Sequence, residues 1–364
     1  MVEMFNDENN VDVAVEKAKE IAAAGKYMLV IGHSLSSASI AAGEIYQEAG
    51  IPAISGSATA ERLTSENEWY FRVIPNSRSQ SVFVANYVYR ILGYDKAAIV
   101  YDVDAFGVSL ADAFEDAFIE LGGDIAEQFS LDRNQSDLED RVNEIAAELA
   151  QLPDGPGIIF YATHANEGAN LIVALKQQQG KVYPGVGASA FSNINFIEKF
   201  NELYEEQYIP GFFSDGIFTV APVVFDVADV AGQMFRDDFL STYQEEPGMK
   251  AATNYDALLV AVQAMKRAGI IGNKSDIENE RKKLRDALAD INSIDEAVNG
   301  VTGLVYFDEV GDIIKPATMM GVYQQGHRIS ALHQLMPVTN PARVIDLVNE
   351  VKEGRIIEVE DQYL

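Results

Sequence analysis

The sequence predicts an α/β protein made of two doubly wound lobes, and three observations support this fold class. Apolar runs of strand length alternate with helix-length runs between residues 27 and 186. The connections between these runs are short, as in repeated β-α-β units. The chain has 364 residues, of which 48% are hydrophobic, which is enough for two domains with separate cores.

The first series of alternating strands and helices contains residues 27–64, the stretch around which the rest of the chain is organised. It is preceded by a predicted strand over 2–5, a polar turn over 6–10 and a helix over 11–24 that Gly25 ends. The stretch itself predicts a strand over 27–32, a helix over 37–49 and a strand over 51–55. Both strands end in turns of small polar residues, at 34–37 and at 57–59. A strand over 68–73 and a helix over 79–92 follow.

The second run starts with KAAIVY at 96–101, an apolar strand of the kind that is buried on both faces of a parallel sheet. The predicted elements after it are a helix over 108–121, a strand over 125–129, a helix over 137–152, a strand over 157–161, a helix over 169–179 and a strand over 182–186. Later elements are an extended stretch over 211–222 and helices over 227–243, within 247–269 and over 277–289. The last two are antiparallel strands over 303–307 and 319–324, with the turn 308–312 between them. The tail predicts a helix from Pro341 and a strand over 356–359.

Composition excludes several classes of function. The formal charge of −29 and the pI of about 4.4 argue against binding to nucleic acid or to an anionic membrane. The chain has no cysteine, so it has no disulfide, thiol nucleophile or thiolate metal site. No run of about 18 apolar residues is present, and no basic-then-apolar leader precedes Val2.

One motif favours an enzyme. The segment VIGHSLS at 30–36 resembles the nucleophile elbow of α/β-hydrolases, with Ser34 as the nucleophile. The second glycine of that motif is replaced by Ser36, and Ser34 follows at most two strands, whereas an elbow normally follows several. His164, His327 and His333 are the candidate bases. No dinucleotide fingerprint, phosphate loop or metal-ligand spacing is present, so we expect no cofactor and no metal.

Polar loops at the predicted carboxyl ends of strands favour a binding protein instead. Ligands of open α/β sheets bind outside these strand ends, and two facing sheets make a cleft between them. The turn at 34–37 also opens a helix, whose first amides and dipole suit an anion. The other loops at strand ends are 57–59, 102–106, 163–167 and 187–189, and 254–256 adds a further polar segment.

Six motifs in a fixed order resemble those of the type I periplasmic binding proteins of the leucine/isoleucine/valine class. They are IGHSLSS, GIPAISGSATAERLT, YFRVIPNSRSQ, YDVDAFG, ATNYDALLVAVQAM and TGLVYFDEVGD, and the resemblance runs from about residue 2 to 334. It implies two lobes joined by three crossovers that close around a small ligand without catalysis. It also implies a periplasmic or extracellular location and an ABC permease as partner.

The resemblance implies lobe boundaries and site residues. Lobe 1 is expected over 1–78 and 223–313, lobe 2 over 79–222 and 314–336, and a C-terminal extension over 337–364. Ser36 and Thr59 are expected to bind the ligand carboxylate, and Ser57 to lend backbone groups. The aromatic residues expected around the ligand are Phe106, His164 and Tyr255.

The chain departs from the family pattern in three places. The acid that pairs with the ligand ammonium would lie near Gly187, where the sequence reads GVGASAF. Either the ligand lacks an ammonium group, or Asp102, Asp104 or Glu167 replaces that acid. Phe106 stands where a tyrosine is usual.

The third departure is that the first strand and helix of the family have no counterpart before Val2. We expect apolar surface to be exposed on the neighbours of that strand. The chain is then incomplete relative to its gene, or another segment such as 356–359 fills the gap.

The main prediction is therefore non-catalytic capture of a small carboxylate, an amino acid or a close relative, for ABC-type uptake. Two alternatives stay open. The first is the extracellular sensor domain of a larger receptor, which transduces a signal through a fused membrane module. The second is a serine hydrolase that uses Ser34.

Overall fold

A computed structural model of the chain describes residues 2–314, 318–331, 333–335 and 356–358, and these residues form two compact units. Unit 1 comprises 2–76 and 228–314, and unit 2 comprises 77–227 together with the described residues after 317. The predicted boundaries after 78, 222 and 313 stay a prediction. The predicted helix from Pro341 lies outside the described residues.

Unit 2 contains a sheet of seven strands whose order is typical of a doubly wound fold. The strands are β4 (Lys96–Asp102), β5 (Asp124–Leu131), β6 (Ile158–Ala162), β7 (Gly185–Gly187), β8 (Ile217–Ala221), β11 (Met319–Gln324) and β12 (His327–Ser330), in the order β12-β11-β8-β7-β6-β4-β5. Strands β4 to β8 are parallel, and β11 and β12 add antiparallel pairs. The strand order reverses between β4 and β6, which is where open sheets of this kind bind ligands.

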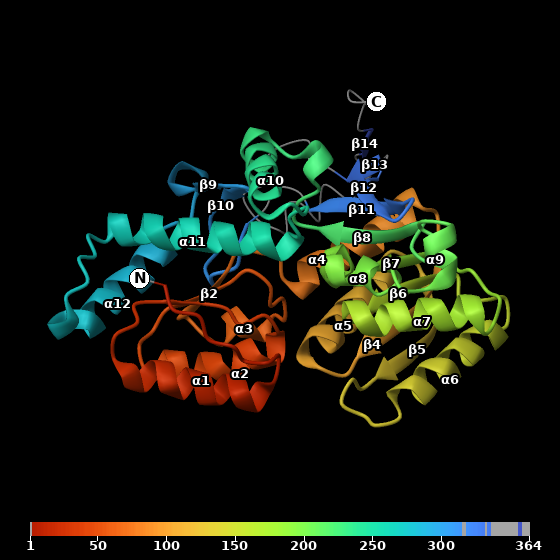
Figure 1. The fold of residues 1–364 in the computed structure, drawn as a ribbon, viewed down its shortest axis with the longest axis horizontal. Coiled ribbons are helices and arrows are strands. Elements are labelled where there is room, and N and C mark those ends of the chain that lie inside the picture. Colours follow the sequence, from red (N-terminus) through yellow and green to blue (C-terminus); the bar gives the residue numbers. More distant parts are fainter. Residues whose placement is uncertain (1, 315–317, 332, 336–355, 359–364) are drawn as a thin grey trace. The chain divides into compact units, whose positions relative to one another are not determined.

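Helices cover both faces of this sheet (Figure 1). Because strand side chains alternate, Ala97 and Ile99 of β4 join one core cluster, while Ala98 and Val100 join the other. The first core also contains α4 (Ser77–Asn86), a π-helical turn (Tyr87–Ile91) and α5 (Ala105–Glu120), and the second contains α6 (Leu138–Gln151) and α7 (Ala165–Gln177). Smaller elements of unit 2 are α8 (Ile194–Glu198), α9 (Tyr204–Tyr208), β13 (His333–Leu335) and β14 (Ile356–Glu358).

Unit 1 repeats the plan on a smaller parallel sheet, in the order β1-β2-β3. Its strands are β1 (Val30–Ile31), β2 (Ala53–Ser55) and β3 (Tyr70–Arg72). The helices α1 (Val11–Ala24) and α2 (Ser36–Glu48) pack on one face, and α11 (Met249–Arg267) and α12 (Ile277–Ala289) pack on the other. Unit 1 also contains α3 (Arg62–Ser65), α10 (Val230–Tyr243) and the hairpin of β9 (Val298–Gly300) and β10 (Gly303–Val305). The doubly wound fold class is thereby confirmed.

Three element predictions are wrong. The segment 2–5 is not a strand, because it pairs with no strand among the described residues; Phe5 instead packs on the ring of Tyr27, with 5.5 Å between the ring centroids. The segments 303–307 and 319–324 do not pair with each other, since β10 pairs with β9 while β11 pairs with β8 and β12. Strand β14 pairs with β13 and therefore does not extend the sheet of unit 1.

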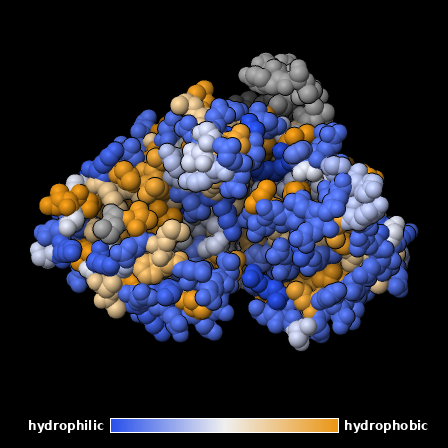
Figure 2. All heavy atoms as spheres, viewed as in Figure 1, coloured by the Kyte–Doolittle hydropathy of each residue, from blue (hydrophilic) through white to orange (hydrophobic). Residues whose placement is uncertain are grey.

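Unit 1 has apolar surface that its own elements leave uncovered. Strand β1 is at the end of its sheet and Ile31 is 36% exposed, while Leu258 and Val262 of α11 are 43% and 39% exposed. Hydrophobic residues gather over the part of unit 1 that contains α11 and α12, on a surface that is otherwise largely hydrophilic (Figure 2). No helix in the described part of the chain is both long and apolar enough to span a bilayer.

Candidate functional site

The two small-residue turns of unit 1 lie next to each other because β1 and β2 are parallel neighbours. Ser36 is the first residue of α2, and its Oγ accepts hydrogen bonds from the backbone N–H groups of Thr59 at 3.1 Å and Ala60 at 3.2 Å. The structure thus brings the predicted residues Ser36 and Thr59 together. Both are buried, with exposed fractions of 3% and 0%.

The N-terminus of α2 receives no side-chain cap from its N-cap residue. Leu35 occupies the N-cap position and makes no side-chain cap hydrogen bond, and the first turn contains no acidic residue. The first amides of a helix lack intrahelical partners, and the helix dipole places partial positive charge there. This turn therefore has the electrostatic character that an anion needs.

The start of α11 packs against both turns and adds a cation that the sequence analysis missed. Lys250 Nζ donates to Ser34 Oγ at 2.7 Å, and Thr253 Oγ1 donates to the carbonyl oxygen of Gly56 at 2.6 Å. A Cβ on Gly56 would lie 3.0 Å from the backbone N of Asn254, so glycine permits this close approach. One sequence feature could have pointed to Lys250: it is a lysine four residues before the Asn254-Tyr255-Asp256 segment, in a strongly acidic chain.

Ser57 and Tyr255 are more exposed than Ser36 and Thr59. Ser57 is half-buried, and its backbone N–H donates to Ser55 Oγ at 3.2 Å. The side chain of Tyr255 is 44% exposed, and its ring lies 5.1 Å from that of Phe235 in α10. Their roles toward a ligand stay predictions.

Unit 2 places a second polar cluster where its strand order reverses. His164 follows β6, and Asp104 follows β4; His164 Nε2 and Asp104 Oδ2 are 2.7 Å apart. Asp104 also caps α5 by accepting from the N–H groups of Phe106 and Gly107, both at 3.0 Å. The Phe106 ring stacks on the His164 ring at 4.9 Å, so two more predicted site residues are in contact.

A buried carboxyl lies beneath this pair. Asp102 Oδ2 accepts from the backbone N–H of His164 at 2.6 Å. Its Oδ1 and the hydroxyl of Thr163 are buried without a hydrogen-bond partner among the described residues. Buried polar groups nearly always have a hydrogen-bond partner. A proton on the carboxyl, a water molecule or a ligand is therefore expected to supply the missing partner of these two atoms.

Burial and charge act in opposite directions on the three ionisable groups. Burial raises the pKa of Asp102 to about 7, against the charge of His164. Burial also opposes the ionised forms of Asp104 and His164, but their mutual hydrogen bond and attraction outweigh it. The pKa of Asp104 is therefore lowered and that of His164 raised, which keeps this pair charged.

The chain matches a known family. Residues 2–326 fit the family model described as periplasmic binding protein. The chain belongs to the periplasmic binding protein family. This class binds substrates and is not catalytic, so the chain is not an enzyme.

Two proteins of Pseudomonas aeruginosa are similar to this periplasmic binding protein. An "Amino acid binding protein" is 29% identical over 166 residues, which span 45% of this chain and 43% of that protein. The "Leucine-, isoleucine-, valine-, threonine-, and alanine-binding protein" is 23% identical over 308 residues, which span 83% of this chain and 74% of that protein.

Solved structures of binding proteins share the fold. A leucine-binding protein LivK from Thermotoga maritima has a TM-score of 0.76 and 21% identity, covering 90% of this chain and 85% of that one. The isoleucine complex of LivJ from Streptococcus pneumoniae has a TM-score of 0.75 at the same identity and coverage. A solute-binding protein from R. palustris in complex with benzoate has a TM-score of 0.72 and 19% identity, covering 90% and 82%.

The hydrolase prediction for Ser34 is wrong, because this family binds rather than cleaves its substrates. In this binding protein the partner of Ser34 is Lys250, not a histidine. The neighbouring His33 is held by Asp7 at 2.7 Å and Tyr46 at 2.9 Å.

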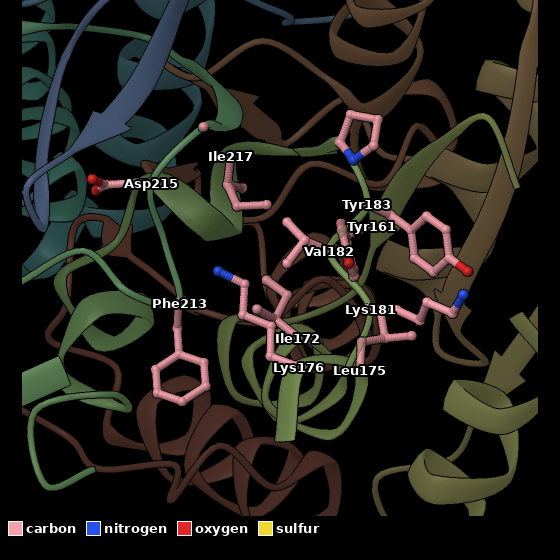
Figure 3. Close-up of a pocket in the computed structure, with 12 residues that line it drawn as sticks. Tyr161, Ile172, Leu175, Lys176, Lys181, Val182, Tyr183, Phe213, Asp215 and Ile217 are labelled. Carbon is pink, nitrogen blue, oxygen red and sulfur yellow. The ribbon is translucent and has the colours of Figure 1, made fainter. Parts of the chain in front are cut away.

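A cavity of about 160 Å³ in unit 2 of this binding protein lies apart from the predicted residues (Figure 3). It is next to the first residues of β7 and β8, whereas the Asp104–His164 cluster follows the last residues of β4 and β6. Its walls are largely apolar, and the Lys176 ammonium at its side donates to the carbonyl oxygen of Phe212. None of the predicted site residues lines it.

Proposed function

We propose that this chain is a solute-binding protein that captures a small carboxylate, either an amino acid or a close relative. The observation that carries the proposal is the open N-terminus of α2, with Ser36 and Thr59 hydrogen-bonded beside it. A carboxylate accepts several hydrogen bonds at once, and charge-assisted bonds are shorter and stronger than neutral ones. The turn offers backbone N–H groups and hydroxyls, which are donors suited to that group.

The names of the related proteins support this ligand class. Amino acids are named for both P. aeruginosa relatives, and the related solved structures include complexes with isoleucine, leucine and benzoate. These three ligands share a carboxylate on an apolar body. We therefore take the carboxylate as the common feature that unit 1 recognises.

The second part of the proposal concerns the polar cluster of unit 2 and the acid that would pair with a ligand ammonium group. Strand β7 ends at Gly187 without an acid, and Glu167, in the first turn of α7, is half-buried. Asp104 is already paired with His164. We propose that Asp102, whose Oδ1 has no partner among the described residues, replaces the acid that pairs with a ligand ammonium group.

Uptake through an ABC transporter in the periplasm or outside the cell completes the proposal. It rests on the family and on relatives described as substrate-binding proteins of such transporters. Delivery to a permease is tested by transport in cells that contain the chain, its permease genes and a labelled ligand. Uptake that persists without the chain would contradict this part.

A ligand panel tests the binding function directly. The chain is heated with each of the twenty L-amino acids and with benzoate, 3,4-dihydroxybenzoate and lactate, and the unfolding midpoint is recorded. A ligand that binds only the folded state raises the midpoint in proportion to the logarithm of its concentration. We expect at least one carboxylate to do so, with a 1:1 stoichiometry by calorimetry. A panel without any shift at millimolar concentration would contradict the proposal.

A further inference from the structure

Lys250 occupies a fixed position beside the open end of α2. It is the second residue of α11, and its Nζ lies 2.7 Å from Ser34 Oγ. The start of α11 is held to the neighbouring turn by the Thr253 hydrogen bond to Gly56. The packing of α11 therefore holds the backbone of Lys250 beside this turn, and the hydrogen bond to Ser34 orients its ammonium group.

The charge of Lys250 is not neutralised by an acid within the described residues. Its ammonium has three donors, and the bond to Ser34 uses one of them. The charge of Asp7 favours the ionised form of Lys250, but Asp7 Oδ2 already lies 2.7 Å from His33 Nδ1. Burial lowers the pKa of Lys250, as expected for a partly desolvated cation that lacks an ion-pair partner.

Two independent features thus favour an anion at the same turn. One is the N-terminus of α2, whose N-cap residue Leu35 makes no side-chain hydrogen bond to it, and the other is a partly buried ammonium whose hydrogen bond among the described residues goes to Ser34 Oγ. A desolvated cation is costly unless an opposite charge pairs with it. A ligand carboxylate is of the right charge to pair with this group.

We propose that Lys250 is a ligand-binding residue of unit 1 that gives the site a full positive charge, so that it selects an ionised carboxylate over the matching amide. This inference rests on the proposed function and deepens it. Recognition of the carboxylate then depends on an ion pair as well as on the neutral donors at Ser36 and Thr59. Ser34 acts as a positioning residue that holds the ammonium.

Calorimetry with two pairs of probes tests this inference. The probes are L-leucine with L-leucinamide and benzoate with benzamide, each titrated into the wild-type chain and into Lys250→Gln. We expect the wild type to prefer at least one carboxylate over its amide by 30-fold or more. In Lys250→Gln the affinity for that carboxylate should fall 10-fold to 100-fold, while the affinity for the amide should change less than 3-fold.

Two further variants separate charge from packing. Lys266→Gln makes the same charge change in the last turn of the same helix, at an exposed residue, and should leave all affinities within 2-fold. Ser34→Ala removes the hydrogen bond but keeps the charge, and should weaken carboxylate binding less than 5-fold. Added NaCl should weaken binding in the wild type more than in Lys250→Gln.

The outcomes distinguish this inference from the proposed function. Binding of a carboxylate by the wild type with unchanged affinity in Lys250→Gln overturns the role of Lys250 and leaves the proposed function intact. An equal loss for carboxylate and amide also overturns it, because that result indicates a packing role. If the wild type binds neither carboxylate and the ligand panel also shows no shift, the inference is overturned together with the proposed function.

Discussion

Arg72 and Asp312 form a buried ion pair that links β3 to the segment after β10. Arg72 Nε donates to Asp312 Oδ1 at 2.8 Å, and the two side chains are 0% and 8% exposed. Arg72 also donates to the carbonyl oxygen of Ala60 at 2.8 Å, and the N–H of Ala60 donates to Ser36. The pair therefore supports the turn of the proposed carboxylate site.

Arg72→Met is expected to destabilise the chain by about 3–5 kcal/mol, because it leaves Asp312 buried without its partner charge. Urea unfolding followed by circular dichroism measures this change. The matched control is Arg62→Met, which breaks an exposed pair with Glu66 and should cost less than about 1 kcal/mol. Equal effects in the two variants would refute the structural role of Arg72.

Ser36→Ala is expected to weaken carboxylate binding by about 1–3 kcal/mol. The change removes the acceptor of the Thr59 and Ala60 N–H groups, so the turn loses both a donor and its shape. Thr59→Ala should have an effect of the same size. Calorimetry measures it, with the exposed Ser65→Ala as the control. Unchanged affinity in both Ser36→Ala and Thr59→Ala would remove these residues from the site.

His164→Gln is expected to lower the unfolding midpoint more at pH 5.5 than at pH 8.5. The pKa of His164 is raised in the folded chain, so the folded state holds this proton more tightly than the unfolded state. The resulting stabilisation is fully present below the unfolded pKa of about 6.5 and is lost as the pH rises through the folded pKa. Thermal melts at both pH values measure it, with the exposed His327→Gln as control. A larger loss at pH 8.5 would reverse the predicted sign.

Asp102→Asn is expected to stabilise the chain more at pH 8.5 than at pH 5.5. The pKa of Asp102 is raised to about 7, so the folded state favours the neutral acid, and stability is lost as the pH rises through about 7. Asparagine keeps an acceptor for the His164 N–H and removes the charge. Melts at both pH values test this, with the exposed Asp124→Asn as control. A pH-independent difference would show that Asp102 does not titrate in this range.

Local signals were sufficient for most helices. The helix α1 has the predicted bounds because Asn10 caps its start and Gly25, at φ 58°, ends it. The helix α12 also has the predicted bounds. The strand at 2–5 and the pairing of β10 could not be predicted locally, since a strand exists only where another strand supplies its hydrogen bonds.

The sequence predicted which residues to consider for the site, but it did not predict how the charged groups of the site pair with each other. Strand-end position and the resemblance were enough to select Ser36, Thr59, Phe106 and His164. The pairing of Asp104 with His164 joins residues 60 positions apart, and that of Lys250 with Ser34 joins residues 216 positions apart. Neither pair has a sequence motif, because each depends on how distant helices and strands pack.

The pair of Asp104 and His164 has a consequence for evolution. Asp104 holds the proton of His164 and caps α5 with the same carboxylate, so a neutral residue at 104 would leave the histidine without its counter-charge. A change at either position alone should be selected against, and a change at both should be tolerated. In related sequences, residues 104 and 164 are therefore expected to vary together. Such covariation would indicate that the ion pair at this strand end is retained as a pair.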